Sequence, residues 1–326
     1  MSNTETDAPI VCKHGAGHPP SEVDTFPPKE VHLGGEDAMR VRRTLPNLRR
    51  SFVGAWCFID HYGPEEGACM DVPPHPHTSL QTVSWLFSGE IEHRDSGGVH
   101  SMVRPGEVNL MTSGYGIAHS EVSTRSRAAL HGVQLWVVLP EDKADLTREF
   151  QHDAPAVYDD HPGVRARMLA GRLGAASSPI HTETPLMGAE VVLDPGVTWE
   201  VEVDAGFEHG VLVDTGDVEF DGVRLDHTVL GVRDAGLDHL RLHNPTDAPA
   251  RVMLLGGTPF DEGIVMWWNF IGRSHDDIVR LRAEWNDAPE DRFGRVLGYR
   301  GSSARLQAPP LPDDLRLKRR FRHGRE

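Results

Sequence analysis

The chain has 326 residues, of which 38% are hydrophobic and 25% charged, so it is long enough for two average domains of a folded, water-soluble protein. Its formal net charge of −16 would repel the negatively charged phosphate backbone of a nucleic acid, so we expect no direct nucleic-acid binding by the main body. The three cysteines, Cys12, Cys57 and Cys69, are too few and too irregularly spaced for a disulfide framework, which favours reduced thiols and a cytoplasmic location.

Residues 1–36 are rich in glycine and proline and have no periodic apolar pattern, which is typical of an extended N-terminal arm. Its first ten residues include Glu5 and Asp7 and contain no continuous apolar stretch, so they do not resemble a secretory signal. Apolar runs such as 135–139 are far shorter than the roughly 20 residues that cross a bilayer. We therefore expect no membrane contact.

Residues 37–145 form the first expected domain. Short apolar stretches alternate there with turn residues and predict antiparallel β-strands, the clearest of which cover 53–59, 80–87, 108–111 and 133–139. The sequence then turns polar over 142–163, with two prolines, which indicates a linker.

A second β-rich domain is expected over residues 160–300. Trp199, Val201 and Val203 alternate with acidic residues, the period of a half-buried strand. Asp221-Gly222 between two short apolar stretches predicts a tight hairpin. The whole chain is therefore predicted to be all-β, and sandwiches, barrels and jelly rolls are the candidate architectures.

A helix is predicted to begin after Ser274, because this N-cap residue is followed three positions later by an acidic residue and then by Ile278, Leu281 and Trp285 on one face. We expect the helix to pack across a barrel. Residues 301–326 end in a basic cluster, interpreted as a solvated tail, with a partner or nucleic-acid contact as the alternative. Its members are Arg316, Lys318, Arg319, Arg320, Arg322 and Arg325.

The candidate metal ligands form two pairs, His75 with His77 and His119 with Glu121. Residues two apart on a strand point to the same side, so each pair can converge on one ion. Neither pair is informative alone, because 19 histidines in the chain make about one His-x-His pair expected by chance. The predicted strands between the pairs form one meander, and its ends can face each other inside a small barrel.

The surrounding motifs resemble the pirin family. The strings that carry the likeness are His75-Pro76-His77, Glu92-His93-Arg94-Asp95-Ser96-Gly97-Gly98, and the run from Pro105 to Glu121, with Phe58 to Pro64 upstream and His131 to Pro140 downstream. In the second half Gly257 to Glu262 and Trp268-Asn269-Phe270 are similar to the family's C-terminal segment. The sequence departs from the family pattern at Thr78, Ser79, Asn109, Leu110 and Tyr115, positions expected to line the approach to the metal.

The resemblance implies a bicupin, with two antiparallel β-barrel (jelly-roll) domains and a C-terminal helix, of which only the first barrel holds metal. It implies His75, His77, His119 and Glu121 as the ligands of one divalent ion. Imidazole with carboxylate suits Fe(II), with Mn, Ni, Cu and Co as alternatives. His93 is weighed as a hydrogen-bond partner of a ligand, against a plain core role.

Two functions follow from the resemblance. In the first, the protein is a quercetin 2,3-dioxygenase-like enzyme that takes O₂ and a small flavonol or another enolisable aromatic, and Glu121 doubles as the base. In the second, it is a metal-dependent regulatory cofactor, related to transcription, that binds a protein partner without turnover. A metal-holding protein with no activity is the third interpretation. In the second domain His181, His209, His239 and His243 form no comparable pair, so no metal is expected there.

Overall fold

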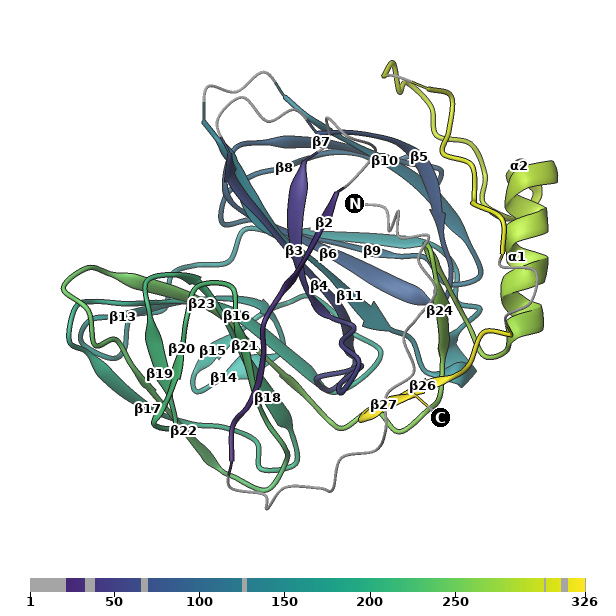
Figure 1. Ribbon diagram of the computed structural model, residues 1–326. Coiled ribbons are helices and arrows are strands. Elements are labelled where there is room, and N and C mark those ends of the chain that lie inside the picture. The colour runs from purple at the N-terminus through teal and green to yellow at the C-terminus, as the bar shows by residue number, and fades with distance from the viewer. Residues whose placement is uncertain are drawn as a thin grey trace.

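The computed structural model describes residues 22–32, 39–65, 70–124, 128–301, 303–311 and 316–325. Its strands build two barrel-like bodies, each made of a large and a small antiparallel sheet (Figure 1). The all-β, two-barrel fold with a C-terminal helix that the sequence predicted is thus confirmed. Cys12, Cys69 and residues 1–21 of the expected arm lie outside the described residues, whereas Cys57 is a buried free thiol.

The first barrel consists of a seven-stranded and a four-stranded sheet. In spatial order the large sheet contains β12 (Glu149–Asp153), β9 (Val108–Thr112), β6 (Leu80–Ser88), β11 (Leu130–Val138), β4 (Trp56–Glu65), β3 (Arg40–Leu45) and β2 (Lys29–His32). The small sheet contains β5 (Asp71–His77), β10 (Ile117–Ser123), β7 (Ile91–Asp95) and β8 (His100–Val103). The strand expected over 53–59 begins only at Trp56, because Gly54 turns the chain with a φ of 52°.

The second barrel has a six-stranded and a four-stranded sheet. The large sheet contains β1 (Asp24–Phe26), β21 (Leu230–Arg233), β18 (Glu208–Thr215), β23 (Ala250–Gly257), β16 (Leu186–Leu193) and β13 (Val164–Ala170). The small sheet contains β17 (Thr198–Glu202), β22 (His239–His243), β19 (Val218–Phe220) and β20 (Val223–Leu225). Asp221 and Gly222 both have positive φ between β19 and β20, which confirms the predicted hairpin.

The remaining elements are short hairpins and helices. They are β14 (Arg172–Leu173) with β15 (Ala176–Ser177), β24 (Val265–Trp267) with β25 (Phe270–Gly272), β26 (Arg320–Phe321) with β27 (Gly324–Arg325), the 3₁₀ turn η1 (Glu141–Lys143), and the helices α1 (His275–Asp287) and α2 (Pro289–Arg292). None of the helices in the described ranges is long and apolar enough to cross a membrane.

Helix α1 begins as predicted. The Ser274 hydroxyl accepts a hydrogen bond from the Asp277 backbone N–H at 3.1 Å, and the Asp277 carboxylate accepts one from the Ser274 N–H at 2.9 Å. Ile278, Leu281 and Trp285 are its buried residues. The helix packs on the hairpin of β24 and β25, and β25 in turn contacts β5 of the first barrel, so the C-terminal segment returns to the N-terminal body (Figure 1).

Three segments expected to be irregular are in part ordered as strands. In the arm, β1 pairs with β21 of the second barrel and β2 with β3 of the first, so this segment joins both bodies. Within the expected linker, β12 adds an edge to β9. The basic tail is not simply solvated, since Arg320 pairs with Ile264 and Arg322 lies 3.3 Å from Glu208. Strands β1, β2 and β12 thus satisfy backbone groups that a sheet edge leaves unpaired.

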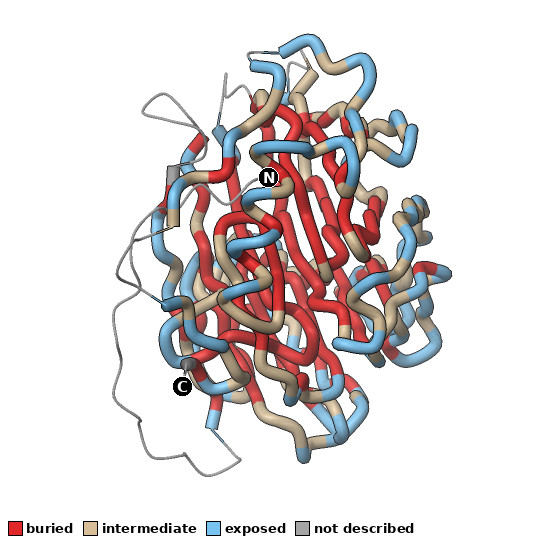
Figure 2. Tube along the Cα trace, turned by 90° about the vertical axis from the view of Figure 1, so that its right-hand side faces the viewer, coloured by how far each residue is buried: buried red, intermediate tan, exposed pale blue. Residues whose placement is uncertain are grey.

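The two barrels share one apolar core. A single cluster of buried side chains includes Trp56 and Trp85 of the first barrel and Leu212 and Leu255 of the second. The Trp56 indole N–H also donates to the Met187 carbonyl oxygen across the interface at 3.1 Å. Figure 2 shows long buried stretches running side by side through the interior, with exposed residues gathered at the turns. The barrels therefore form one packed unit.

Candidate metal centre

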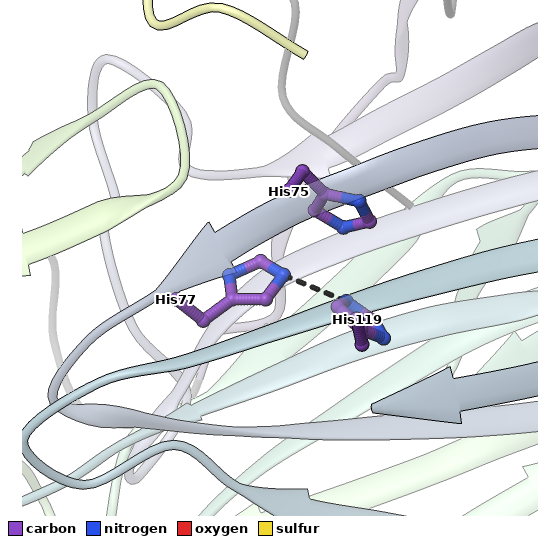
Figure 3. Close-up of side chains that lie close together, drawn as sticks. All are labelled: His75, His77 and His119. Atoms are coloured by element: carbon purple, nitrogen blue, oxygen red, sulfur yellow. Dashed lines mark hydrogen bonds between the residues drawn. The ribbon is translucent and has the colours of Figure 1, made fainter. Parts of the chain in front are cut away.

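Strands β5 and β10 bring three histidines together inside the first barrel. His75 and His77 are on β5, and His119 lies opposite His75 on β10. All three are fully buried, and one ring nitrogen from each lies within 4.8 Å of the others. Figure 3 shows the rings turned toward one another from the two neighbouring strands. His75 and His77, two residues apart on β5, thus point to the same side of the strand, as the sequence predicted.

The ring nitrogens are arranged as ligands rather than as an ordinary hydrogen-bond network. Nδ1 of His75 lies 2.9 Å from the Pro73 carbonyl oxygen, so Nδ1 carries the proton and the lone pair of Nε2 faces inward. That Nε2 has no hydrogen-bond partner among the described residues. Nε2 of His77 and Nε2 of His119 lie 3.0 Å apart, the spacing of two neighbouring nitrogens each about 2.1 Å from a common ion.

Burial keeps these imidazoles neutral. It lowers the pKa of His75, His77 and His119 well below the ordinary value, and for His75 and His119 the charge that a neighbouring histidine would carry adds to the effect. Neutral imidazole is the form that binds metal. The donor set therefore fits a divalent transition-metal ion at neutral pH.

Glu121 occupies a neighbouring position rather than the same triad. Its carboxylate groups with His119 and His93, with ligand atoms again within 4.8 Å of one another, and the residue is buried. The register explains the offset, because three steps of β5 from His75 to Val72 oppose only two steps of β10 from His119 to Glu121. This bulge falls at two prolines, Pro73 and Pro74, which donate no ladder hydrogen bond.

Side chains around Glu121 and His119 complete the polar part of the site. The Ser84 hydroxyl on β6 lies 3.2 Å from Glu121 Oε1 and 3.0 Å from Gln134 Oε1. Nδ1 of His93 lies 3.4 Å from Nδ1 of His119, on the side of His119 away from His77. Burial of the Tyr62 hydroxyl, together with the charge of Glu121, raises the pKa of that phenol.

A segment from the far end of the chain closes the site. The Asn269 carbonyl oxygen lies 3.2 Å from Nδ1 of His77, and the Thr78 hydroxyl donates to the Ile271 carbonyl oxygen at 3.0 Å. The Trp136 ring packs edge-on to His77 with centroids 5.0 Å apart. These contacts fix the orientation of His77 and keep one side of the centre apolar.

Sequence reasoning singled out His75, His77, His119, Glu121 and, as a partner of a ligand, His93, and the structure gathers all five into two overlapping groups. It did not assign Ser84, Gln134, Tyr62 or Asn269 to the site. Tyr62, Gln134 and Asn269 lie in strings that carry the family resemblance, but nothing local links them to the histidines, and Asn269 lies 192 residues from His77. In the second barrel His181 and Glu183 form an ion pair of 3.3 Å in which the imidazole is 68% exposed.

Among the residues that depart from the family pattern, Tyr115 lines an open cavity of about 550 Å³. The cavity lies between the turn before β10 and the C-terminal helices, and its lining residues are Tyr115, Asp145, Glu284, Ala288, Asp291 and Arg292. The Arg148 guanidinium lies over the Tyr115 ring at 5.1 Å, and Arg292 donates to the Tyr115 carbonyl oxygen at 2.8 Å. Four of the six lining residues, Asp145, Glu284, Asp291 and Arg292, carry ionisable side chains.

Comparison with known proteins gives a consistent result for both halves of the chain. The Pirin family model matches residues 38–137, and the Pirin C-terminal cupin domain matches residues 188–294. The "Putative quercetin 2,3-dioxygenase PA1205" of Pseudomonas aeruginosa is 40% identical over 287 residues, which cover 87% of this chain and 89% of that protein. Pirin of Homo sapiens is 26% identical over 261 residues, covering 76% and 87%.

Among solved structures, quercetin 2,3-dioxygenase from Acinetobacter baumannii superimposes with a TM-score of 0.84 at 34% identity. The match covers 90% of this chain and 97% of that one.

Proposed function

The chain belongs to the pirin family, and from that premise we propose that this bicupin is a mononuclear metal-dependent dioxygenase acting on a quercetin-like flavonol or another small enolisable aromatic. The observation that carries the proposal is the inward-facing, unpartnered Nε2 of His75 beside Nε2 of His77 and His119. The names of the two most similar proteins reported above support the substrate class.

We propose that His75, His77, His119 and Glu121 hold the ion, and that the first barrel is the metal-binding domain. Imidazole with one carboxylate suits Fe(II) best, while Mn, Ni, Cu and Co suit the same donors. When bound, the ion supplies the redox and Lewis-acid chemistry for the reaction of an enolisable substrate with O₂.

Glu121 is the residue that takes the proton from the substrate hydroxyl. As a proposed ligand next to His119, Glu121 has a carboxylate at the centre where a hydroxyl group of a bound aromatic would arrive. The Ser84 hydroxyl, 3.2 Å from Glu121 Oε1, orients that oxygen by hydrogen bonding and can turn to Gln134 when the carboxylate is protonated. Trp136 and the buried β-strands around the site exclude bulk water.

The change Glu121→Gln tests the base role. Metal content should change little, because three imidazoles remain, whereas turnover should fall by about 10²- to 10⁴-fold, the usual worth of a general base. The assay is O₂ uptake with a panel of flavonols after anaerobic loading with Fe(II), combined with metal analysis of the same samples. Glu219→Gln, the same chemical change on β19 of the second barrel, is the matched control.

The alternative function is a metal-dependent regulatory protein without turnover. The likeness to human Pirin and the net charge of −16, which favours a basic protein partner, support it. If loaded wild-type protein takes up no O₂ with any flavonol or other enolisable aromatic, this alternative replaces the enzyme. If Glu121→Gln retains full turnover, the enzyme remains but Glu121 is not its base.

A further inference from the structure

A second group of metal-ligating side chains lies where the two barrels meet. It contains His61 of β4 and His131 of β11 from the first barrel and Asp214 of β18 from the second. All three are buried, and their ligand atoms lie within 4.8 Å of one another. None of them belongs to the candidate metal centre described above.

Both imidazoles converge on one carboxylate oxygen. Oδ1 of Asp214 lies 2.7 Å from Nε2 of His61 and 2.6 Å from Nε2 of His131. Despite the short distance, Nε2 of His131 makes no hydrogen bond in the described part of the chain, so its nitrogen is directed past the oxygen rather than at it. A side chain that is only 6% exposed thus holds a ring nitrogen 2.6 Å from the shared oxygen without the alignment of a hydrogen bond.

The other oxygen of Asp214 is already engaged. Nε of Arg251 donates to Oδ2 at 2.7 Å, and the Arg251 guanidinium lies over the Phe87 ring at 4.2 Å. Arg251 therefore fixes the carboxylate plane and leaves Oδ1 for the imidazoles, as residues behind a metal ligand commonly do.

A third histidine faces the group from the second barrel. The His227 ring lies edge-on to that of His61, with centroids 5.6 Å apart and an angle of 90° between the planes. His227 belongs to the turn between β20 and β21. Unlike the three buried groups, His227 is an exposed residue, so it lies on the solvent side of the cluster.

We propose that His61, His131 and Asp214 bind a second divalent ion of the zinc class at the barrel interface. Two imidazole nitrogens and one carboxylate oxygen, all buried, are a donor set that zinc accepts. The ion would tie the barrels together, because its ligands come from both. The sequence predicted one ion per chain and gave no sign of this site, since 153 residues separate His61 from Asp214.

Zinc stoichiometry tests the proposal without any activity assay. Metal-free, tag-free protein is loaded with Zn(II), freed of excess ion by gel filtration and analysed for bound zinc. We expect two equivalents in the wild type, one in His131→Gln and one in His75→Ala with His119→Ala. The matched control, His100→Gln on the exposed surface of β8, should retain both equivalents.

The outcomes separate this proposal from the proposed function. A folded His75→Ala/His119→Ala protein without zinc, or His131→Gln with two equivalents, would overturn the interface site and leave the cupin centre untouched. If the double variant does not fold, the comparison of wild type with His131→Gln decides alone. Loss of one equivalent in the double variant with no O₂ uptake in the wild type would count against the dioxygenase only.

Discussion

His209 on β18 provides a prediction whose size can be worked out from its surroundings. The side chain is buried in the second barrel next to the Phe207 ring, with 2% of the residue exposed, and its Nε2 has no hydrogen-bond partner within the described ranges. Burial lowers the pKa of His209 from 6.5 to about 4, against a small opposite effect of Asp204. The imidazole is therefore held neutral in the folded protein.

The sign and magnitude follow from linkage. As pH falls below 6.5 the unfolded chain binds a proton at His209 that the folded protein cannot yet accept, so folding stability is lost between pH 6.5 and 4 and the loss then levels off. A shift of about 2.5 units corresponds to roughly 3 kcal/mol. The change His209→Met removes the titrating group and puts an apolar side chain of similar length in its place.

Urea unfolding followed by tryptophan fluorescence at several pH values from 7 to 4 measures the effect. The free energy of unfolding of His209→Met minus that of the wild type should rise by roughly 3 kcal/mol as the pH falls from 7 to 4, because only the wild type loses stability through His209. The contributions of all other titrating groups cancel in this difference. His181→Met is the control, since solvent already surrounds that ring in the folded protein. A difference that stays flat with pH would refute the account of a neutral, buried imidazole.

Three further changes test other parts of the structure. Metal loading should raise the melting temperature measured by differential scanning calorimetry, because an ion at 100 times its Kd adds about 2.7 kcal/mol to the unfolding free energy; no shift would contradict a preformed site. Ser274→Ala should cost about 1 kcal/mol in urea unfolding through loss of the cap on α1, and Ser274→Thr, which keeps the hydroxyl, should restore it. Arg43→Met should cost about 3–5 kcal/mol, because it leaves the fully buried Asp60 without its two hydrogen bonds of 2.7 and 2.8 Å. The double change Arg43→Met with Asp60→Leu should recover most of that loss in the same assay, and failure to do so would show that packing rather than charge dominates there.

Local patterns predicted local structure well. The capping box at Ser274 and the Asp221-Gly222 hairpin are determined by neighbouring residues, and both appear as expected. The same holds for His75 and His77, because alternation along a strand needs no knowledge of the rest of the fold.

The features that could not be predicted depend on the register between strands and on contacts between residues far apart in the sequence. The bulge in β5 moves Glu121 opposite the region of Val72, so the i, i+2 rule holds within β10 but not across the strand pair. Asn269 reaches His77 and Asp214 reaches His61 over 192 and 153 residues, distances at which periodicity carries no information. The arm strands β1 and β2 have only three and four residues, too few for a periodic pattern, although Phe26 and Val31 are buried in the core.

The return of the C-terminal segment to the first barrel also fixes an order of assembly during synthesis. The barrel strands that carry His77 and His119 leave the ribosome well before β25, which supplies the Asn269–Phe270 wall and the bridge from Phe270 to Thr78. At 5–20 residues per second, roughly 7–27 s separate the end of β11 from the end of β25. During that interval the second barrel is being made while the histidine triad still lacks one wall, so the nascent chain offers an ion a wider entrance than the finished protein does.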